Sequence, residues 1–229
     1  MLFFHNSALL NHVFGVTKYS IPKDFEIAAI AVQDTTSCLT VNADSRWKSV
    51  KEMAEEIASK PNTISYAGET GGYNYIMGVM FEQAAGGKFK MVDVGANAQK
   101  IASMVGGQLD TTVFPGSLIK GFLASNKLRV LGIMAEERHP AFPDLPTFKE
   151  LGYDIEGAKC YYFAFPKGTP KNIIDTFNAA LRKALKDPET IKKMEENYLI
   201  NPNLETDKAL AYLQKLQDNY QKIADSAKK

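Results

Sequence analysis

Segments that read as strands alternate with segments that read as helices along most of the chain, and this alternation limits the fold more than any other feature. Short apolar runs such as Thr63–Ala67 and Tyr161–Phe165 have the length and composition of strands. A helical pattern lies between them, for example the one with Val50, Met53 and Ile57 on one face. Alternation of this kind predicts an α/β protein built around a mainly parallel sheet. With 229 residues, the chain can form one large domain or two lobes of about 100 residues each.

The same patterns predict the remaining elements. Further strands are expected at Met1–Phe4, Phe25–Gln33, Thr36–Asn42, Phe89–Val94, Leu109–Phe114 and Leu128–Ala135. Further helices are expected from near Gly72, at Ala96–Val105, Ser117–Ala124 and Thr147–Leu151, after Pro170, after Pro188, and from Thr206 to about Ala227. Ser49-x-x-Glu52 predicts a capping box, and Thr169 is placed to cap the helix that Pro170 begins. Gly86-Gly87 is expected to end the helix that begins near Gly72.

Composition excludes several classes of function. Lys plus Arg number 27 and Asp plus Glu 26, so the chain lacks the concentrated basic charge of a nucleic-acid-binding protein. No apolar run reaches the roughly 18 residues that span a bilayer. Two cysteines, Cys38 and Cys160, exclude a disulfide-rich scaffold and a four-cysteine zinc site. They could be two buried thiols or one disulfide, depending on the compartment.

Motifs for catalysis and for cofactors are absent from the sequence. The three histidines, His5, His12 and His139, have no partners at metal-ligand spacing, so we expect no metal site. Neither a G-x-S-x-G nucleophile turn nor a dinucleotide or P-loop fingerprint is present, so we expect no cofactor. Enzymatic activity is therefore unsupported by any motif.

A glycine-rich turn, Gly68–Gly72, follows the strand Thr63–Ala67 and opens onto a helix. Such a turn can aim several backbone N–H groups at one point, where an anion can bind. Tyr73 and Tyr75, which flank Asn74, could add hydroxyl donors and an aromatic wall. The alternative is that the glycines only allow tight packing between strand and helix, and that Tyr75 belongs to the core.

Several short motifs occur in a fixed order after this turn: Gly106-Gly107-Gln108-Leu109-Asp110, then Pro143-Asp144-Leu145-Pro146-Thr147, then Pro166-Lys167-Gly168-Thr169-Pro170. Together with the glycine turn, this series resembles the tripartite tricarboxylate transporter receptors, also called Bug or TctC proteins. The resemblance covers essentially the whole chain. These proteins are periplasmic and bind solutes.

The resemblance implies a two-lobed α/β fold of the type II periplasmic-binding-protein kind, with two crossover strands near Cys38–Asn42 and Cys160–Phe165. One lobe would comprise residues 1–42 and 160–229, and the other residues 43–159. Met1-Leu2-Phe3-Phe4 reads as a strand and not as a signal peptide. We therefore expect the first lobe to lack its N-terminal part, about a quarter of a family member. A disulfide between the two crossover strands is a further hypothesis.

The resemblance also implies which residues bind the solute. One set lies in the complete lobe: Gly68, Glu69, Thr70, Gly71, Gly72, Tyr73, Asn74 and, at the start of a strand near the cleft, Asp110. The other lobe would contribute His5, Asn6, Ser7 and Asn11. Glu69 and Tyr73 depart from the small or hydroxyl residues that the family usually has there. A carboxylate beside an anion site repels an anion, so either Glu69 points away or the solute carries an amine or is neutral.

The implied function is that of a monomeric receptor which closes around a small carboxylate and delivers it to membrane permease subunits, with no bond made or broken. Because the first lobe is incomplete, we expect this chain to bind solute weakly or not at all, and a sub-micromolar affinity would contradict that expectation. The alternatives are a ligand-sensing domain of the same fold, which would need a fused DNA-binding segment, and an enzyme on a related α/β scaffold.

Overall fold

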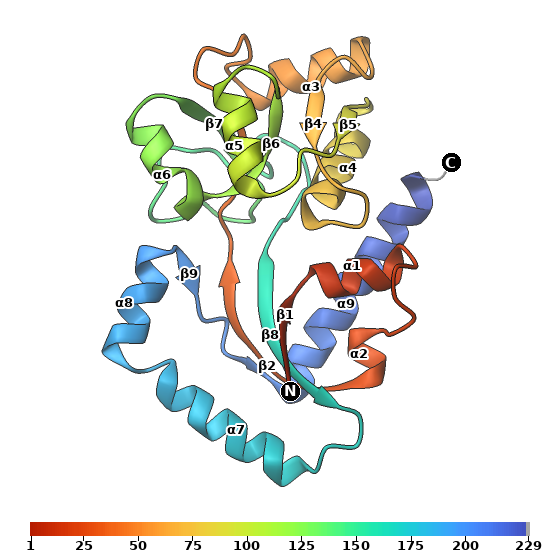
Figure 1. Cartoon of the computed structure of the whole chain (residues 1–229), viewed down its shortest axis with the longest axis vertical. Helices are drawn as coiled ribbons and strands as arrows, with labels where there is room; N and C mark the ends of the chain where they lie inside the picture. Colours follow the sequence, from red (N-terminus) through yellow and green to blue (C-terminus); the bar gives the residue numbers. More distant parts are fainter. Residues whose placement is uncertain (228–229) are drawn as a thin grey trace. The chain divides into compact units, whose positions relative to one another are not determined.

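The computed structural model describes residues 1–227 and shows a chain that folds as two units (Figure 1). Unit 1 comprises Met1–Asp34 and Lys159–Lys229, and unit 2 comprises Thr35–Ala158. The chain therefore passes from one unit to the other twice, between Asp34 and Thr35 and between Ala158 and Lys159. Within residues 1–227, no helix is both long and apolar enough to cross a membrane.

Unit 1 is built on one sheet with the strand order β1-β8-β2-β10, and β9 pairs with another part of β2. Its elements are β1 (Leu2–His5), α1 (Ser7–Val13), α2 (Ile21–Asp24), β2 (Phe25–Asp34), β8 (Lys159–Pro166), α7 (Lys171–Ala184), α8 (Pro188–Glu196), β9 (Leu199–Ile200), β10 (Leu204–Glu205) and α9 (Thr206–Ala227). Both α7 and α9 pack on β2, and Figure 1 shows them on opposite sides of the strands. The core of unit 1 therefore lies between this sheet and its helices.

Unit 2 is built on a second sheet with the strand order β5-β4-β6-β3-β7. Its elements are β3 (Ser37–Asn42), α3 (Val50–Ser59), β4 (Ser65–Ala67), α4 (Tyr73–Ala85), β5 (Lys90–Val92), α5 (Asn97–Val105), β6 (Thr111–Pro115), α6 (Gly116–Ala124) and β7 (Leu128–Ile133). A cluster of fully or nearly fully buried side chains, among them Met104, Phe114 and Ile119, forms part of its core. The units differ from the lobes expected from the sequence in residues 35–42 and 159, because β3 pairs with β6 and β7 of unit 2.

The prediction of a mainly parallel sheet is wrong. Every strand pair of unit 1 is antiparallel, and in unit 2 only β4 with β5 and β4 with β6 are parallel. Connectivity explains the pairing of β2 with β8. The chain leaves unit 1 where β2 ends and returns where β8 begins, so the paired residues Asp34 and Lys159 lie at one edge and the two strands run in opposite directions.

Helix signals were mostly but not always correct. Ser49 Oγ accepts a hydrogen bond from the backbone N–H of Glu52, but the Glu52 carboxylate accepts from the N–H of Lys48 instead of Ser49, so the predicted capping box is half formed. Asp187 caps α8. Thr169 does not cap α7, because its hydroxyl donates to the carbonyl of Pro166 instead. The helix predicted at Thr147–Leu151 is absent, since Thr147 bridges to Ile133 and the N–H of Phe148 donates to the carbonyl of Ile133.

The two cysteines are buried thiols, and the disulfide alternative is wrong in this structure. Cys38 packs in the core cluster of unit 2. Cys160 lies on β8 in unit 1, where its Sγ accepts a hydrogen bond from the side-chain amide of Gln33 at 3.2 Å. Each thiol is thus engaged by side chains of its own unit.

Candidate functional site

The glycine turn between β4 and α4 is held in a conformation that requires glycine. A Cβ atom on Gly68 would lie 2.9 Å from the Cα of Tyr75, which is closer than side chains tolerate. Gly71 has a φ of +83°, in the left-handed region that favours glycine. Gly72 is the N-cap of α4, and as a glycine it has no side chain with which to cap the helix. The turn therefore brings backbone, rather than side chains, to the amino end of α4.

Two further helices begin at the same edge of the unit 2 sheet. Because β5 and β6 are both parallel to β4, the carboxyl ends of these three strands meet at one edge, and α4, α5 and α6 follow them. At α5, Gln99 Oε1 accepts a hydrogen bond from the backbone N–H of Ala96 at 2.7 Å, and at α6, Thr36 Oγ1 accepts one from the backbone N–H of Gly116 at 2.9 Å. The partial positive charge of a helix amino end favours an anion. In open α/β sheets, ligands bind outside the carboxyl ends of the strands.

Glu69 is the charged side chain of the turn, and it has a partner. Its Oε2 accepts a hydrogen bond from the Nζ of Lys100 on α5 at 2.8 Å. The Lys100 side chain is only 3% exposed, whereas that of Glu69 is 46% exposed. The carboxylate that seemed incompatible with an anion site is therefore paired with a buried ammonium group.

Tyr73 and Asn74 serve the framework of unit 2 with their side chains. The hydroxyl groups of Ser37 and Tyr73 lie 2.8 Å apart, and each lies within hydrogen-bond distance of the carbonyl oxygen of Gly157, at 2.6 and 2.7 Å. The amide of Asn74 donates to Thr112 Oγ1 and to the carbonyl of Val113. These contacts fix the first turn of α4 against the neighbouring strands.

Tyr66, on β4, also links this strand to the first turn of α4. Its hydroxyl donates to the backbone carbonyl of Asn74 at 2.9 Å. Burial raises the pKa of Tyr66 above its usual range, so this hydroxyl keeps its proton and stays a donor. Thr70, by contrast, is exposed and is the one hydroxyl side chain within Gly68–Gly72.

Asp110, which the resemblance placed near the cleft with the glycine turn, lies at a different edge of the unit 2 sheet. It precedes β6 and accepts hydrogen bonds from the backbone N–H and the hydroxyl of Ser65, at 2.8 and 2.7 Å. Ser65 begins β4, so this contact lies at the amino edge of the parallel strands. The glycine turn lies at the carboxyl edge. The structure therefore does not bring Asp110 together with Gly68–Asn74, because parallel strands place their beginnings and ends at opposite edges.

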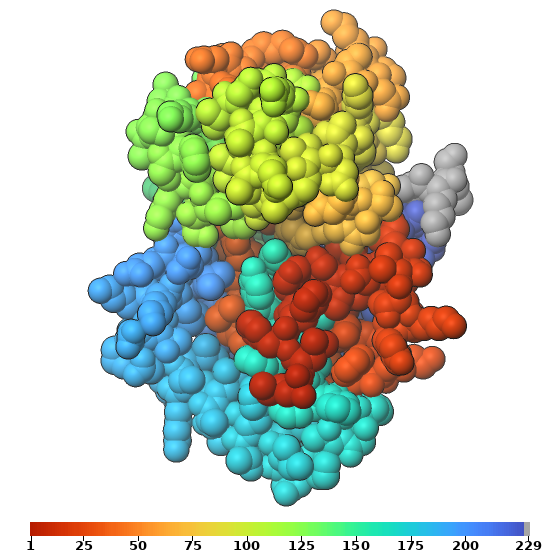
Figure 2. All heavy atoms as spheres, in the orientation of Figure 1, coloured from red at the N-terminus to blue at the C-terminus, as the bar shows by residue number. Residues whose placement is uncertain are grey.

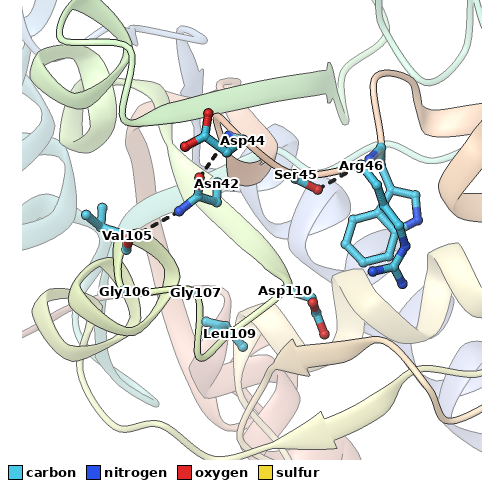
Figure 3. Close-up of a pocket in the computed structure, with 10 residues that line it drawn as sticks. Asn42, Asp44, Ser45, Arg46, Val105, Gly106, Gly107, Leu109 and Asp110 are labelled. Carbon is cyan, nitrogen blue, oxygen red and sulfur yellow. Dashed lines mark hydrogen bonds between the residues drawn. The ribbon is translucent and has the colours of Figure 1, made fainter.

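Asp110 instead lines a pocket of about 430 Å³ within unit 2 (Figure 3). Arg46 on its rim binds Glu56 with two nitrogens and lies over the ring of Trp47 at 3.9 Å. The side-chain amide of Asn42 donates to the carbonyls of Met104 and Val105 at the end of α5. Asn42, Arg46 and Asp110, which line this pocket, are thus each held by hydrogen bonds to other groups of unit 2.

The four residues expected from the other lobe lie in unit 1, and the structure gives them different surroundings. Asn6 is fully buried. Its Nδ2 donates to Tyr220 at 2.7 Å, and its Oδ1 accepts from the backbone N–H of Cys160 at 2.7 Å. Ser7, at the start of α1, and Asn11 are half-buried. Asn6 therefore holds β8 and α9 together with its side chain.

His5 ends β1 and has an aromatic environment. Its ring stacks on Phe4 with centroids 4.8 Å apart and meets the edge of Tyr161 at 5.6 Å. Burial, with a smaller contribution from the charge of Lys159, lowers the pKa of His5 to about 4. Its Nδ1 accepts from the backbone N–H of Ser7, so the neutral ring carries its proton on Nε2. Figure 2 shows the N-terminal strand at the surface of unit 1, where Phe3 is 51% exposed.

Lys100 is the residue that reasoning from sequence missed. It occurs four positions before Met104 on α5, and Met104 is fully buried. Residues four apart lie on the same helix face, so the spacing places Lys100 on the buried side. A lysine at that position is the signal that could have identified a buried ion pair.

A family model described as "Tripartite tricarboxylate transporter family receptor" matches residues 2–228. One curated relative, the "UPF0065 protein in tcbD-tcbE intergenic region" of Pseudomonas sp. (strain P51), is 24% identical over 183 residues, which are 78% of this chain and 54% of that protein. The chain spans about half the length of the curated relatives that it matches first.

Solved structures show the same fold. MatC from Rhodopseudomonas palustris, determined with bound malate, has a TM-score of 0.84 at 20% identity, and the match covers 97% of this chain and 78% of that one. The periplasmic binding protein BugD has a TM-score of 0.84 at 23% identity, covering 99% and 77%. At these identities the likeness establishes the fold, and the expected two-lobed, periplasmic-binding-protein-like α/β class is confirmed.

Proposed function

Because the chain belongs to the tripartite tricarboxylate transporter receptor family, we propose that it is a receptor for a small organic solute of the carboxylate class. The observation that carries this proposal is the edge of unit 2 where β4, β5 and β6 end. Three helices begin there, and the glycine turn presents backbone at the start of α4, whose N-cap Gly72 has no side chain. Malate, which MatC binds, is a carboxylate of the kind such an edge favours.

The proposed site uses the two sets of residues in different ways. Gly68, Gly71 and Gly72 shape the turn, and Thr70 is its exposed hydroxyl. Tyr73 and Asn74 hold the start of α4 in place through Gly157 and Val113. From unit 1 we propose His5, Ser7 and Asn11 as contacts, with Asn6 positioning them through its bond to β8. Asp110 is left out because it bonds to Ser65 at the opposite edge.

We further propose that the protein works as a carrier in the periplasm and makes or breaks no covalent bond. Capture of the solute between the two lobes would allow a membrane permease to recognise the loaded form. A single chain suffices for this, so the receptor would act as a monomer. The family supports the carrier role, since its members are described as receptors of a transporter.

Calorimetric titration with a panel of small mono-, di- and tricarboxylates tests the proposal. We expect binding weaker than about 1 μM, so the solutes are used at up to millimolar concentration. Gly72→Ala should weaken binding by about tenfold or more, because its Cβ would lie 2.9 Å from the carbonyl oxygen of Glu69 and displace the turn.

Gly121→Ala is the matched control. A Cβ on Gly121, in α6, meets nothing within 4 Å, so this variant should bind as the wild type does. Circular dichroism confirms that both variants are folded. If no carboxylate of the panel binds the wild type, or if Gly72→Ala binds unchanged, the proposed function is wrong.

A further inference from the structure

The side chain of Glu69 lies across the amino end of α4. A Cβ atom built on Gly72, the N-cap, would lie 3.0 Å from the Cγ of Glu69 and 3.2 Å from its carboxyl carbon. The backbone carbonyl of Glu69 also accepts a hydrogen bond from the N–H of Gly72 at 2.8 Å. The chain therefore places a carboxylate of its own beside the helix end that favours an anion.

Lys100 holds that carboxylate from the neighbouring helix. Its Nζ donates to Oε2 of Glu69 at 2.8 Å, and its side chain is 97% buried. A buried ammonium group needs a counter-ion, because an uncompensated charge in the interior is strongly unfavourable. Within residues 1–227, Glu69 is the carboxylate that forms an ion pair with Lys100.

We propose that Glu69 is a built-in counter-ion which fills the carboxylate position formed by Lys100 and the amino end of α4, and thereby determines which solutes the site accepts. This inference rests on the proposed function. A solute carboxylate at this position would meet a positive charge that is already neutralised, and it would be repelled by Glu69. The preferred solute therefore presents an uncharged hydrogen-bonding group, such as an amide or a hydroxyl, to the glycine turn and carries its carboxylate elsewhere.

Chemical rescue tests the counter-ion without knowledge of the solute. Glu69→Ala removes the carboxylate and leaves Lys100 with space beside it. Acetate, at about ten times its dissociation constant, should then raise the unfolding temperature of this variant by about 3 °C or more. Acetamide, which has the same shape and no charge, should not do so.

Three controls isolate the effect. The wild type already has its carboxylate, and Glu69→Ala combined with Lys100→Met has no ammonium group to compensate, so acetate should stabilise neither. Glu136→Ala removes one partner of an exposed ion pair with Lys149, where solvent replaces the lost carboxylate. If acetate stabilises Glu69→Ala no more than it stabilises these three proteins, the proposal is overturned.

A pair of solutes that differ by one charge tests the specificity. Succinamate and succinate have nearly the same shape, but succinate carries a second carboxylate. The wild type should bind succinamate at least about tenfold more tightly, and the isosteric Glu69→Gln should reverse the preference, because Lys100 can then pair with the solute. Equal or tighter binding of succinate by the wild type, or an unchanged ratio in Glu69→Gln, would overturn the proposal.

The two experiments separate this inference from the proposed function. If neither solute binds to any variant and the carboxylate panel also fails, the proposed function is wrong, while the acetate rescue still decides whether Glu69 fills a carboxylate position. If a carboxylate of the panel binds and acetate fails to rescue Glu69→Ala, the receptor function stands and the proposal that Glu69 is a built-in counter-ion is wrong.

Discussion

Each glycine of the turn is required for a different geometric reason. Gly68 leaves room for the Cα of Tyr75, Gly71 adopts a left-handed backbone, and Gly72 leaves room for Glu69. Their spacing in the sequence was enough to predict a strand-to-helix turn. It could not predict that Glu69 is paired, because the partner Lys100 lies 31 residues away on another helix.

Asn6, in unit 1, is a second residue whose distant partner could not be predicted from the sequence. The sequence placed it among the solute contacts, yet it is buried and bonds to Tyr220, which lies 214 residues further along the chain. A polar residue in a turn gives no sign of whether it faces solvent or a distant helix. Contacts of this range depend on the tertiary fold, and so the roles of individual polar residues were the least predictable part of the site.

His5 gives a pH dependence whose sign follows from its surroundings. Its pKa is lowered from 6.5 to about 4 in the folded protein, mainly through burial. The unfolded chain therefore binds more protons between these values, and the stabilising contribution of neutral His5 is present above pH 6.5 and is lost as the pH falls toward 4. We expect the His5 ring resonances to titrate near pH 4 in NMR spectra.

Replacement of His5 provides the control. In His5→Gln, the free energy of unfolding measured with urea should fall less between pH 6.5 and pH 4.5 than in the wild type, by about 1 kcal/mol after allowance for the partial exposure of the ring. A His5 that titrates near its ordinary value of 6.5 would contradict this account of its environment.

At the scale of elements, local sequence patterns predicted where helices and strands occur better than they predicted the direction of the strands. Strands were expected at Met1–Phe4, Phe25–Gln33 and Tyr161–Phe165, and the structure has β1, β2 and β8 there with slightly different bounds. The long helix α9 was expected too. Strand direction was wrong in unit 1, because it depends on the chain leaving and re-entering the unit between β2 and β8. The absent helix at Thr147–Leu151 has a similar cause, since its backbone bonds to β7.

The end of α4 gives a stability prediction. Gly86 closes this helix with a φ of +67°, and Gly87 then passes against α3, where a Cβ would lie 2.4 Å from the backbone carbonyl of Ile57. Because backbone cannot move as a side chain can, Gly87→Ala should lower the free energy of unfolding by about 1–3 kcal/mol or more, as measured by urea denaturation.

Gly121→Ala again serves for comparison, because this exposed position in α6 has nothing within 4 Å. Alanine favours a helix over glycine, so this variant should be more stable than the wild type by about 0.5–1 kcal/mol. Equal effects of the two substitutions would show that the close approach of Gly87 to α3 has been assigned wrongly.

At the scale of the whole molecule, the order of motifs was more informative than any single motif. The pieces from Gly106 to Pro170 predicted the family correctly, although no catalytic or cofactor fingerprint was present. The chain forms two units and passes between them twice. The identity of the solute could not be predicted, since it depends on the individual side chains and charges around the proposed site.

Mapping of solute binding by NMR tests the central claim most directly. Succinate and succinamate are titrated to about 10 mM into the ¹⁵N-labelled chain, which nearly fills a site of millimolar affinity. The account predicts that the largest amide shifts occur in Gly68–Asn74, at the start of α4, and that Gly106, Gly107 and Asp110 in the pocket of Figure 3 are unaffected. Largest shifts at Gly106–Asp110, or no shifts with either solute, would contradict it.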